Sequence, residues 1–211
     1  MPVGSMRSRR EFNGRRVSSA AGRRGTLHTR DFRGFANLAL TFALIFLAVS
    51  VSVARDSSGK LELTTTAFRP GSTIPTQFTC SGANISPTLS WNNPPPRTQS
   101  FVLIVDDPDA PVRTWVHWVV YNLPASARQL PGNVQRGAAV AGGGEQGLND
   151  FPMRGYGGPC PPPGNPHRYF FRLYALDTIL HLRAPARRRD VDAAMQGHVL
   201  AQAELMGTFG R

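Results

Sequence analysis

Residues 115–123 have the sequence WVHWVVYNL, which is dense in valine and aromatic side chains and carries no formal charge. Valine, tryptophan and tyrosine are enriched in β-strands, so we predict a strand here. Side chains alternate along a strand, and the two predicted faces are Trp115, His117, Val119 and Tyr121 on one side, and Val116, Trp118 and Val120 on the other. A buried histidine needs partners for its ring nitrogens, so His117 is either a core residue bonded to backbone or part of a site.

Runs with the same strand character lie on either side of this segment, at residues 61–68, 101–105 and 169–176. Clusters of proline and glycine separate these runs, at residues 92–96, 141–147 and 155–166. Short strands between such turns predict a mainly β fold, with an antiparallel, sandwich-like arrangement.

Near the end of the chain, the spacing of apolar side chains changes from that of a strand to that of a helix. From Arg187 onward, apolar or long side chains recur every three or four residues, at Val191, Met195, Val199, Gln202 and Met206. This spacing predicts an amphipathic C-terminal helix of about four turns that packs on the sheet. His198 lies beside this stripe, where a structural histidine is favoured over a ligand-binding one.

Residues 106–111 have the sequence DDPDAP and directly follow the predicted strand at 101–105. The prolines end that strand in a rigid turn, and the proline after Asp107 favours an extended conformation at Asp107 itself. Many such turns do no more than cap a strand. Here, however, only a short connection leads to Trp115, so the two strands can be hairpin neighbours with Asp107 close to Trp115 and His117.

Residues 155–163 have the sequence GYGGPCPPP, and His167, Arg168 and Tyr169 follow. A phosphate-binding loop needs a helix directly after its glycines, and the prolines forbid one here. We therefore expect a rigid wall whose backbone N–H groups could meet an anion. In the strand that follows, His167, Tyr169 and Phe171 share one face and Arg168 lies on the other.

Together these motifs resemble the phosphatidylethanolamine-binding protein family, and in particular its bacterial, Raf-kinase-inhibitor-like branch. The resembling segments are DPDAP at 107–111, WVHWVVYN at 115–122, the loop at 155–162 with HRY at 167–169, TCSGANISP at 79–87, and residues 198–207. The resemblance covers residues 61–211. It implies an antiparallel β fold with a terminal helix and a site for phosphate-type head groups. The implied site residues are Asp107, Trp115, His117, Gly158, Pro161, His167 and Tyr169. Cys160 stands where animal members have a glycine, so the kinase-regulating role of eukaryotic members does not transfer directly.

The net charge of +11 is concentrated at the N-terminus. Nine arginines and two acidic residues within 1–34 account for +7, which leaves +4 for residues 35–211. A domain with this small excess has no strong attraction to phosphate backbones, so nucleic acid is not an expected partner.

From Phe35 to Ala54 the sequence has no charged side chain and is rich in Leu, Ala, Phe and Val. The basic residues before it and the small residues Ser52 and Ala54 at its end predict a secretory signal cleaved after Ala54. The alternative is an uncleaved membrane anchor, since twenty helical residues span about 30 Å. We therefore divide the chain into a leader with a signal peptide or anchor at 1–54 and a ligand-binding domain at 55–211. The domain is expected to be exported, either periplasmic or secreted, or else tethered to the membrane.

Two cysteines lie in the part expected to be exported, Cys80 and Cys160. In an oxidising compartment they could form one disulfide, and two free thiols are the alternative.

The predicted function is non-enzymatic binding of a small phosphate-bearing or phosphoethanolamine-like anion, such as a phospholipid head group, without a cofactor. An anion between two imidazoles favours their protonated forms, and Asp107 could accept a ligand ammonium or orient a histidine tautomer. One alternative is an inhibitor of a protease or kinase that acts through a surface loop. Another is a metal-dependent hydrolase, since two histidines and one aspartate match a facial metal triad in composition, although no H-E-x-x-H, C-x-x-C or G-x-S-x-G motif occurs. A homodimer is also left open.

Overall fold

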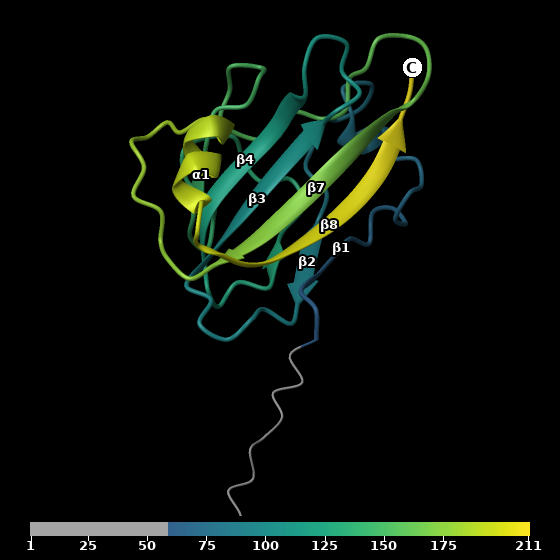
Figure 1. The fold of residues 1–211 in the computed structure, drawn as a ribbon. Helices are drawn as coiled ribbons and strands as arrows, with labels where there is room; N and C mark the ends of the chain where they lie inside the picture. The colour runs from purple at the N-terminus through teal and green to yellow at the C-terminus, as the bar shows by residue number, and fades with distance from the viewer. Residues whose placement is uncertain (1–58) are drawn as a thin grey trace, which may run out of the picture. The chain divides into compact units, whose positions relative to one another are not determined.

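The structure, a computed structural model, describes residues 59–211 (Figure 1). The predicted leader, and the signal peptide or anchor from Phe35 to Ala54, lie outside these residues. Within 59–211, no helix combines the length and the apolar composition needed to span a membrane.

The larger of two antiparallel sheets has five strands in the order β6-β4-β3-β7-β8. These strands are β3 (Ser100–Asp107), β4 (Trp115–Pro124), β6 (Glu145–Gln146), β7 (His167–Leu176) and β8 (Val199–Phe209). β3 lies at the centre of the sheet, and all of its residues are buried. Figure 1 shows the four long strands side by side with a common twist. The strands predicted at 101–105, 115–123 and 169–176 are thus confirmed, each with a small extension.

The second sheet is formed by three short strands in the order β1-β2-β5, namely β1 (Glu62–Thr64), β2 (Leu89–Asn92) and β5 (Gln129–Leu130). A single 3-10 turn, η1 (Thr76–Phe78), lies between β1 and β2 in the chain. Trp91 and Leu130 of this sheet pack with Trp118 and Phe171 of the larger one in a common apolar core. Two sheets closing one core confirm the predicted antiparallel, sandwich-like β fold. Only residues 62–64 of the strand predicted at 61–68 pair with a neighbour.

The helix α1 (Arg188–Met195) covers the other face of the larger sheet (Figure 1). Its buried residues, Val191 and Met195, are one turn apart and pack with Ile104 of β3 and Val119 of β4 in a second apolar core. The predicted C-terminal amphipathic helix is therefore present.

The predicted length of that helix was wrong, because the segment from Val199 onward is strand β8. Residues 199–209 pair with β7 over ten positions, and their inward side chains alternate as in a strand, with Ala203, Leu205 and Phe209 buried. The spacing of three or four residues was a coincidence of composition, and long-range pairing with β7 decides the conformation.

His198 lies between α1 and β8, and its backbone N–H donates to the carbonyl oxygen of Met195 at 2.9 Å. Its Nδ1 is 2.9 Å from the carboxylate of Asp177, and about half of the side chain is exposed, at 47 %.

The outer edge of β8 is partly covered near the end of the chain. Gly71 N donates to Met206 O at 2.7 Å, Ile74 N donates to Thr208 O at 2.7 Å, and Thr208 N donates to Ser72 O at 3.0 Å. A short loop of residues 71–74 therefore satisfies backbone groups that an edge strand would otherwise expose.

Candidate functional site

A bulge in β4 sets the direction of His117. Trp118 pairs with Val105 and Val116 pairs with Asp106, so His117 is an extra residue without a partner in β3. The extra residue lets Trp118 point into the core between the sheets, while Trp115 and His117 line one cavity.

The bulge also corrects the predicted faces of β4. Val119 and Tyr121 do not share the face of His117, since both pack with Val116 in the core beneath α1. The prediction that Trp115 and His117 share a face is retained, because both side chains line the same cavity.

Asp107 is the last residue of the central strand β3, and it contacts residues of both neighbouring strands, β4 and β7, at one end of the sheet. It lies opposite Trp115 in the register, and its Oδ2 is 2.8 Å from Nδ1 of His167, the first residue of β7. Its Oδ1 accepts a hydrogen bond from the backbone N–H of Asp109 at 2.8 Å, which holds the carboxylate within the turn. Both oxygens of Asp107 are thus engaged, and the residue orients the ring of His167.

The ring of His117 is buried and held in one tautomer. Its Nδ1 is 2.6 Å from the carbonyl oxygen of Gly157, and a carbonyl only accepts, so Nδ1 carries the proton. The ring packs edge-on against Tyr169 at 5.2 Å and against Phe151 at 5.3 Å between centroids. Burial lowers the pKa of His117, while the hydrogen bond to Gly157 and the charge of Asp107 oppose that shift.

The segment around residues 157–162 forms a wall beside these side chains, but the expectation that its backbone N–H groups could meet an anion was wrong for Gly157 and Gly158. The N–H of Gly157 donates to the carbonyl oxygen of His117 at 3.0 Å, and that of Gly158 is also used within the protein. A disulfide joins Cys160 to Cys80, and Cys80 N donates to Pro159 O at 3.0 Å. Gly158 N donates to Asn84 Oδ1 at 2.7 Å. A side chain at Gly158 would collide with the carbonyl oxygen of Phe78, so glycine is required by the close approach of two backbones.

The wall and the three strand ends enclose a cavity of about 230 Å³. Its lining combines polar groups with small or aromatic apolar groups: Asp107, Ala110, Pro111, Trp115, His117, Phe151, Cys160, Pro161, Pro162 and His167. Five of the seven residues implied by the family resemblance therefore line one cavity. The other two lie just behind it, Gly158 within the wall and Tyr169 against the ring of His117.

Phe151 lines the cavity, and no sequence pattern pointed to it. Its position depends on Asn149, whose Oδ1 accepts from the backbone N–H of Phe151 at 3.0 Å and whose Nδ2 donates to the carbonyl of His117 at 3.2 Å. The ring of Phe151 then lies edge-on to Trp115 at 5.4 Å. The hydrogen bonds of Asn149 thus hold the ring of Phe151 in the lining of the cavity.

Two hydrogen-bond donors at this site have no partner within the described residues. They are the buried Nε1 of Trp115 and the buried hydroxyl of Tyr169, and only Trp91 elsewhere in 59–211 shares this property. Burial, the charge of Asp107 and the approach of its carboxylate to the hydroxyl raise the pKa of Tyr169, so the hydroxyl keeps its proton. The hydroxyl and this carboxylate do not meet the geometry of a hydrogen bond. One of these donors, on Trp115, belongs to the cavity lining, and the other, on Tyr169, lies behind the ring of His117.

No group of three His, Cys, Asp or Glu side chains within 59–211 has an arrangement that could hold a metal ion. The facial triad considered from composition is thus not formed by these residues.

The buried ring of His117 leads to a prediction about acid stability. The unfolded chain takes up a proton at this residue below the ordinary histidine pKa of 6.5, whereas burial opposes that protonation in the folded state. Stability should therefore fall as the pH drops below 6.5, by up to about 1.4 kcal/mol per pH unit for one proton. Urea unfolding at pH 7.5, 6.5 and 5.5 should show a shallower pH dependence for His117→Gln than for the wild type, and parallel curves would contradict the expectation.

The segment that matches known sequences contains strands of both sheets and the residues of the site. Residues 64–210 match a family model described as phosphatidylethanolamine-binding protein. A UPF0098 protein of Methanothermobacter thermautotrophicus is 50% identical over 151 residues, which cover 72% of this chain and 99% of that protein. A UPF0098 protein of Aquifex aeolicus is 46% identical over 153 residues, which cover 72% and 89% of the two chains.

Solved structures show the same fold. A crystal structure from Chlamydia trachomatis, described as a homologue of phosphatidylethanolamine-binding protein, has a TM-score of 0.67 and 42% identity. It matches 73% of this chain and 99% of its own. E. coli YbcL, described as a member of the mammalian family, has a TM-score of 0.67 and 33% identity, and covers 72% and 99% of the two chains.

Proposed function

Because the chain belongs to the phosphatidylethanolamine-binding protein family, we propose that the cavity between Asp107, His117 and His167 binds a small ligand bearing a phosphate group. The observation that carries this proposal is the pair of buried donors without partners, Trp115 Nε1 and the Tyr169 hydroxyl. A buried donor left unpaired costs about 1–3 kcal/mol, and phosphate oxygens are strong acceptors that would remove this cost.

The two histidines suit the same ligand. Nδ1 of His117 bonds to a carbonyl and Nδ1 of His167 to a carboxylate, which leaves Nε2 of each ring for a ligand. A protonated ring donates from Nε2 to a phosphate oxygen, and a neutral ring accepts from a monoprotonated phosphate. Binding would therefore favour uptake of a proton at the site.

The size and charge of the cavity narrow the ligand further. Its volume of about 230 Å³ is below the range of about 300–1,000 Å³ that is typical for drug-sized ligands, which favours a compact head group. Asp107 places a negative charge at the same site, so a ligand that carries an ammonium besides its phosphate suits it better than a simple anion. Phosphoethanolamine has this combination.

We also propose that the domain acts after export, on the basis of the basic leader and the apolar segment from Phe35 to Ala54. The disulfide between Cys80 and Cys160 supports this proposal, since such bonds persist mainly in oxidising compartments. Thiol-blocked extraction from cells followed by non-reducing mass spectrometry tests it, and two blocked thiols in the native protein would contradict it.

Two tyrosine-to-phenylalanine changes test the ligand proposal. Tyr169→Phe removes a donor without a partner, so affinity for phosphoethanolamine should fall by about tenfold or more, with no loss of stability. Tyr156→Phe is the matched control, because its hydroxyl already donates to Phe78 O at 2.9 Å. That variant should lose about 1 kcal/mol of stability and largely keep its affinity.

The measurement is an NMR titration of the full chain with phosphate and with phosphoethanolamine. The ring signals of His117 and His167 should shift in the wild type, more strongly at low ligand concentration with phosphoethanolamine. Unmoved histidine signals at millimolar ligand, or equal affinities for wild type and Tyr169→Phe, would remove the proposal.

A further inference from the structure

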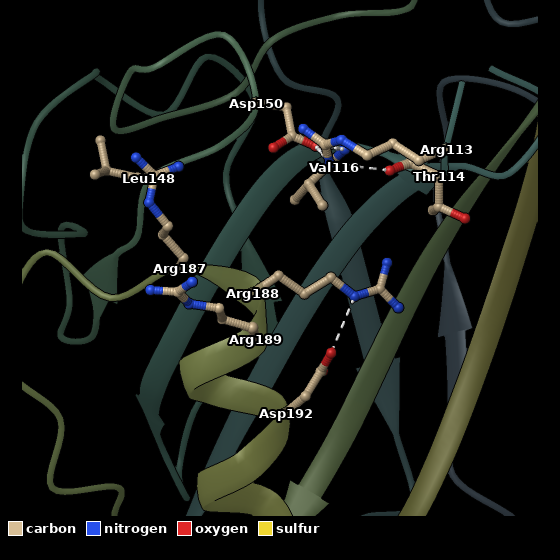
Figure 2. Close-up of a pocket in the computed structure, with 9 residues that line it drawn as sticks. All are labelled: Arg113, Thr114, Val116, Leu148, Asp150, Arg187, Arg188, Arg189 and Asp192. Carbon is tan, nitrogen blue, oxygen red and sulfur yellow. Dashed lines mark hydrogen bonds and ion pairs between the residues drawn. The ribbon is translucent and has the colours of Figure 1, made fainter. Parts of the chain in front are cut away.

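A second and larger cavity lies on the opposite face of the five-stranded sheet. It has a volume of about 400 Å³ and lies between the start of α1 and the start of β4 (Figure 2). Val116 lines this cavity, whereas its neighbours Trp115 and His117 line the first one. The sheet thus separates the two cavities, and nothing in the proposed function involves the second.

The second cavity is strongly basic. Four arginines line it, Arg113 and Arg187 to Arg189, against only two carboxylates, Asp150 and Asp192. The formal charge of these lining side chains is therefore +2, which matches a divalent anion.

Two of these arginines are already committed to the protein. Arg188 extends over the sheet and pairs with Asp192 of the same helix at 3.2 Å (Figure 2). It also pairs with the buried Asp106 of β3. Arg113 donates to Asp150 at 2.8 Å. Their roles in the fold are thus clear without a ligand.

The other two arginines, Arg187 and Arg189, do not form ion pairs with other elements of the described fold. The backbone N–H of Arg187 donates to the carboxylate of Asp190 at 2.9 Å, as the first residue of a capping box. Its guanidinium is in no ion pair with another described residue, and in Figure 2 it extends toward Leu148. Arg189 contacts only the adjacent Asp190, at 3.2 Å, and its side chain is 83 % exposed.

The charge of Arg187 nevertheless acts within the cavity. Burial alone would raise the pKa of Asp150, but hydrogen bonds from Arg113 and Val116 N and the charges of Arg113 and Arg187 together lower it. Arg187 and Arg113 therefore act on the same carboxylate from two different elements.

The position of these arginines at α1 is electrostatically unfavourable in the absence of an anion. Arg187 is the N-cap residue, and Arg188 and Arg189 are the first two residues of the helix, at the positive end of its dipole. The backbone N–H groups of Arg188 and Arg189 donate to no acceptor within the described residues. Asp190 is the acidic residue of the first turn and pairs with Arg189, so the three cations at this helix start outnumber it. An excess of cations at this end breaks a local rule of stability, as functional sites commonly do.

We propose that this cavity is a second anion site, which takes a small divalent anion of the phosphate type through Arg187, Arg189 and the first N–H groups of α1. A divalent anion would neutralise the net charge of the lining and offset the repulsion at the start of the helix. Arg113 and Asp150 form the opposite wall and limit the size of the occupant.

The test compares the full wild-type chain with the double variant Arg187→Gln/Arg189→Gln. Inorganic phosphate is titrated against chloride at matched ionic strength, with the side-chain Nε–H signals of the arginines followed by NMR. In the wild type the signals of Arg187 and Arg189 should shift, and the double variant should bind phosphate at this site at least about tenfold more weakly. Arg69→Gln, at an exposed arginine remote from α1, is the matched control and should change nothing.

A stability measurement without phosphate separates a binding role from a structural one. Removing two cations from the positive end of the helix should leave the urea midpoint unchanged or raise it. A fall in the midpoint of the double variant, unmoved arginine signals, or wild-type affinity in the double variant would each overturn the proposal. The ring signals of His117 and His167 report the first cavity independently, so failure at one site is distinguished from failure at the other.

Discussion

The double variant Cys80→Ser/Cys160→Ser is expected to lose about 4.5 kcal/mol of unfolding free energy relative to the oxidised wild type. The disulfide closes a loop of 80 residues, which includes the strands β2 to β6 and the cavity-lining residues Ala110, Pro111 and Phe151. In the chain-entropy description, the bond lowers the entropy of the unfolded chain, and this contribution grows with loop length. Urea unfolding of both proteins at pH 7.5 measures the difference.

Reduction provides a control within the same experiment. Dithiothreitol should lower the wild-type midpoint to that of the serine variant and leave the variant itself unchanged. Since Cys160 lines the first cavity, the variant should also bind phosphoethanolamine more weakly even under conditions where it is fully folded. A serine variant whose stability lies within 1 kcal/mol of the wild type would contradict the expectation.

A second large effect is expected for Asp106→Ala, with a loss of about 3–5 kcal/mol. Asp106 is almost fully buried, at 1% exposure, and its carboxylate pairs with Arg172 of β7 and with Arg188 of α1. It joins the helix to the sheet in addition to the apolar packing of Val191 and Met195. Removing it leaves two partly buried guanidinium groups without their shared partner, which is more costly than removing the whole group of charges.

Asp109→Ala is a matched control three residues away. The carboxylate of Asp109 also forms an ion pair, a two-pronged contact with Arg168, and this hydrogen bonding lowers the pKa of Asp109 to about 2. However, more than half of the Arg168 side chain is exposed, so solvent screens the pair and its loss should cost about 1 kcal/mol or less. If urea unfolding showed equal losses of unfolding free energy for Asp106→Ala and Asp109→Ala, burial would not be the reason for the stabilising effect of Asp106.

The strands could be predicted largely from local sequence, and the first cavity only in part. Runs of valine and aromatic residues marked β3, β4 and β7, and the proline-bounded turn after β3 placed Asp107 opposite Trp115. The convergence of Asp107 with His167 was implied by the family resemblance, since alternation within a strand says nothing about which strand is its neighbour.

The features that escaped prediction depend on pairing between distant residues. The bulge at His117 is a property of the register between β3 and β4, so it left no mark in the alternation of β4 itself. The segment from Val199 has helical spacing, yet its pairing with β7 makes it a strand. The second cavity joins Arg113 to Arg187, 74 residues further along the chain, and neither position is unusual in the sequence.

The loop of residues 71–74 along β8 has a consequence for association between copies of this chain. An uncovered edge strand is a template on which a second molecule can add its own strand and extend the sheet, which is a common route to aggregation. Here the hydrogen bonds from Gly71 and Ile74, and that from Thr208 to Ser72, already occupy the end of this edge. The sheet is therefore protected from growth at the end where its longest strand finishes.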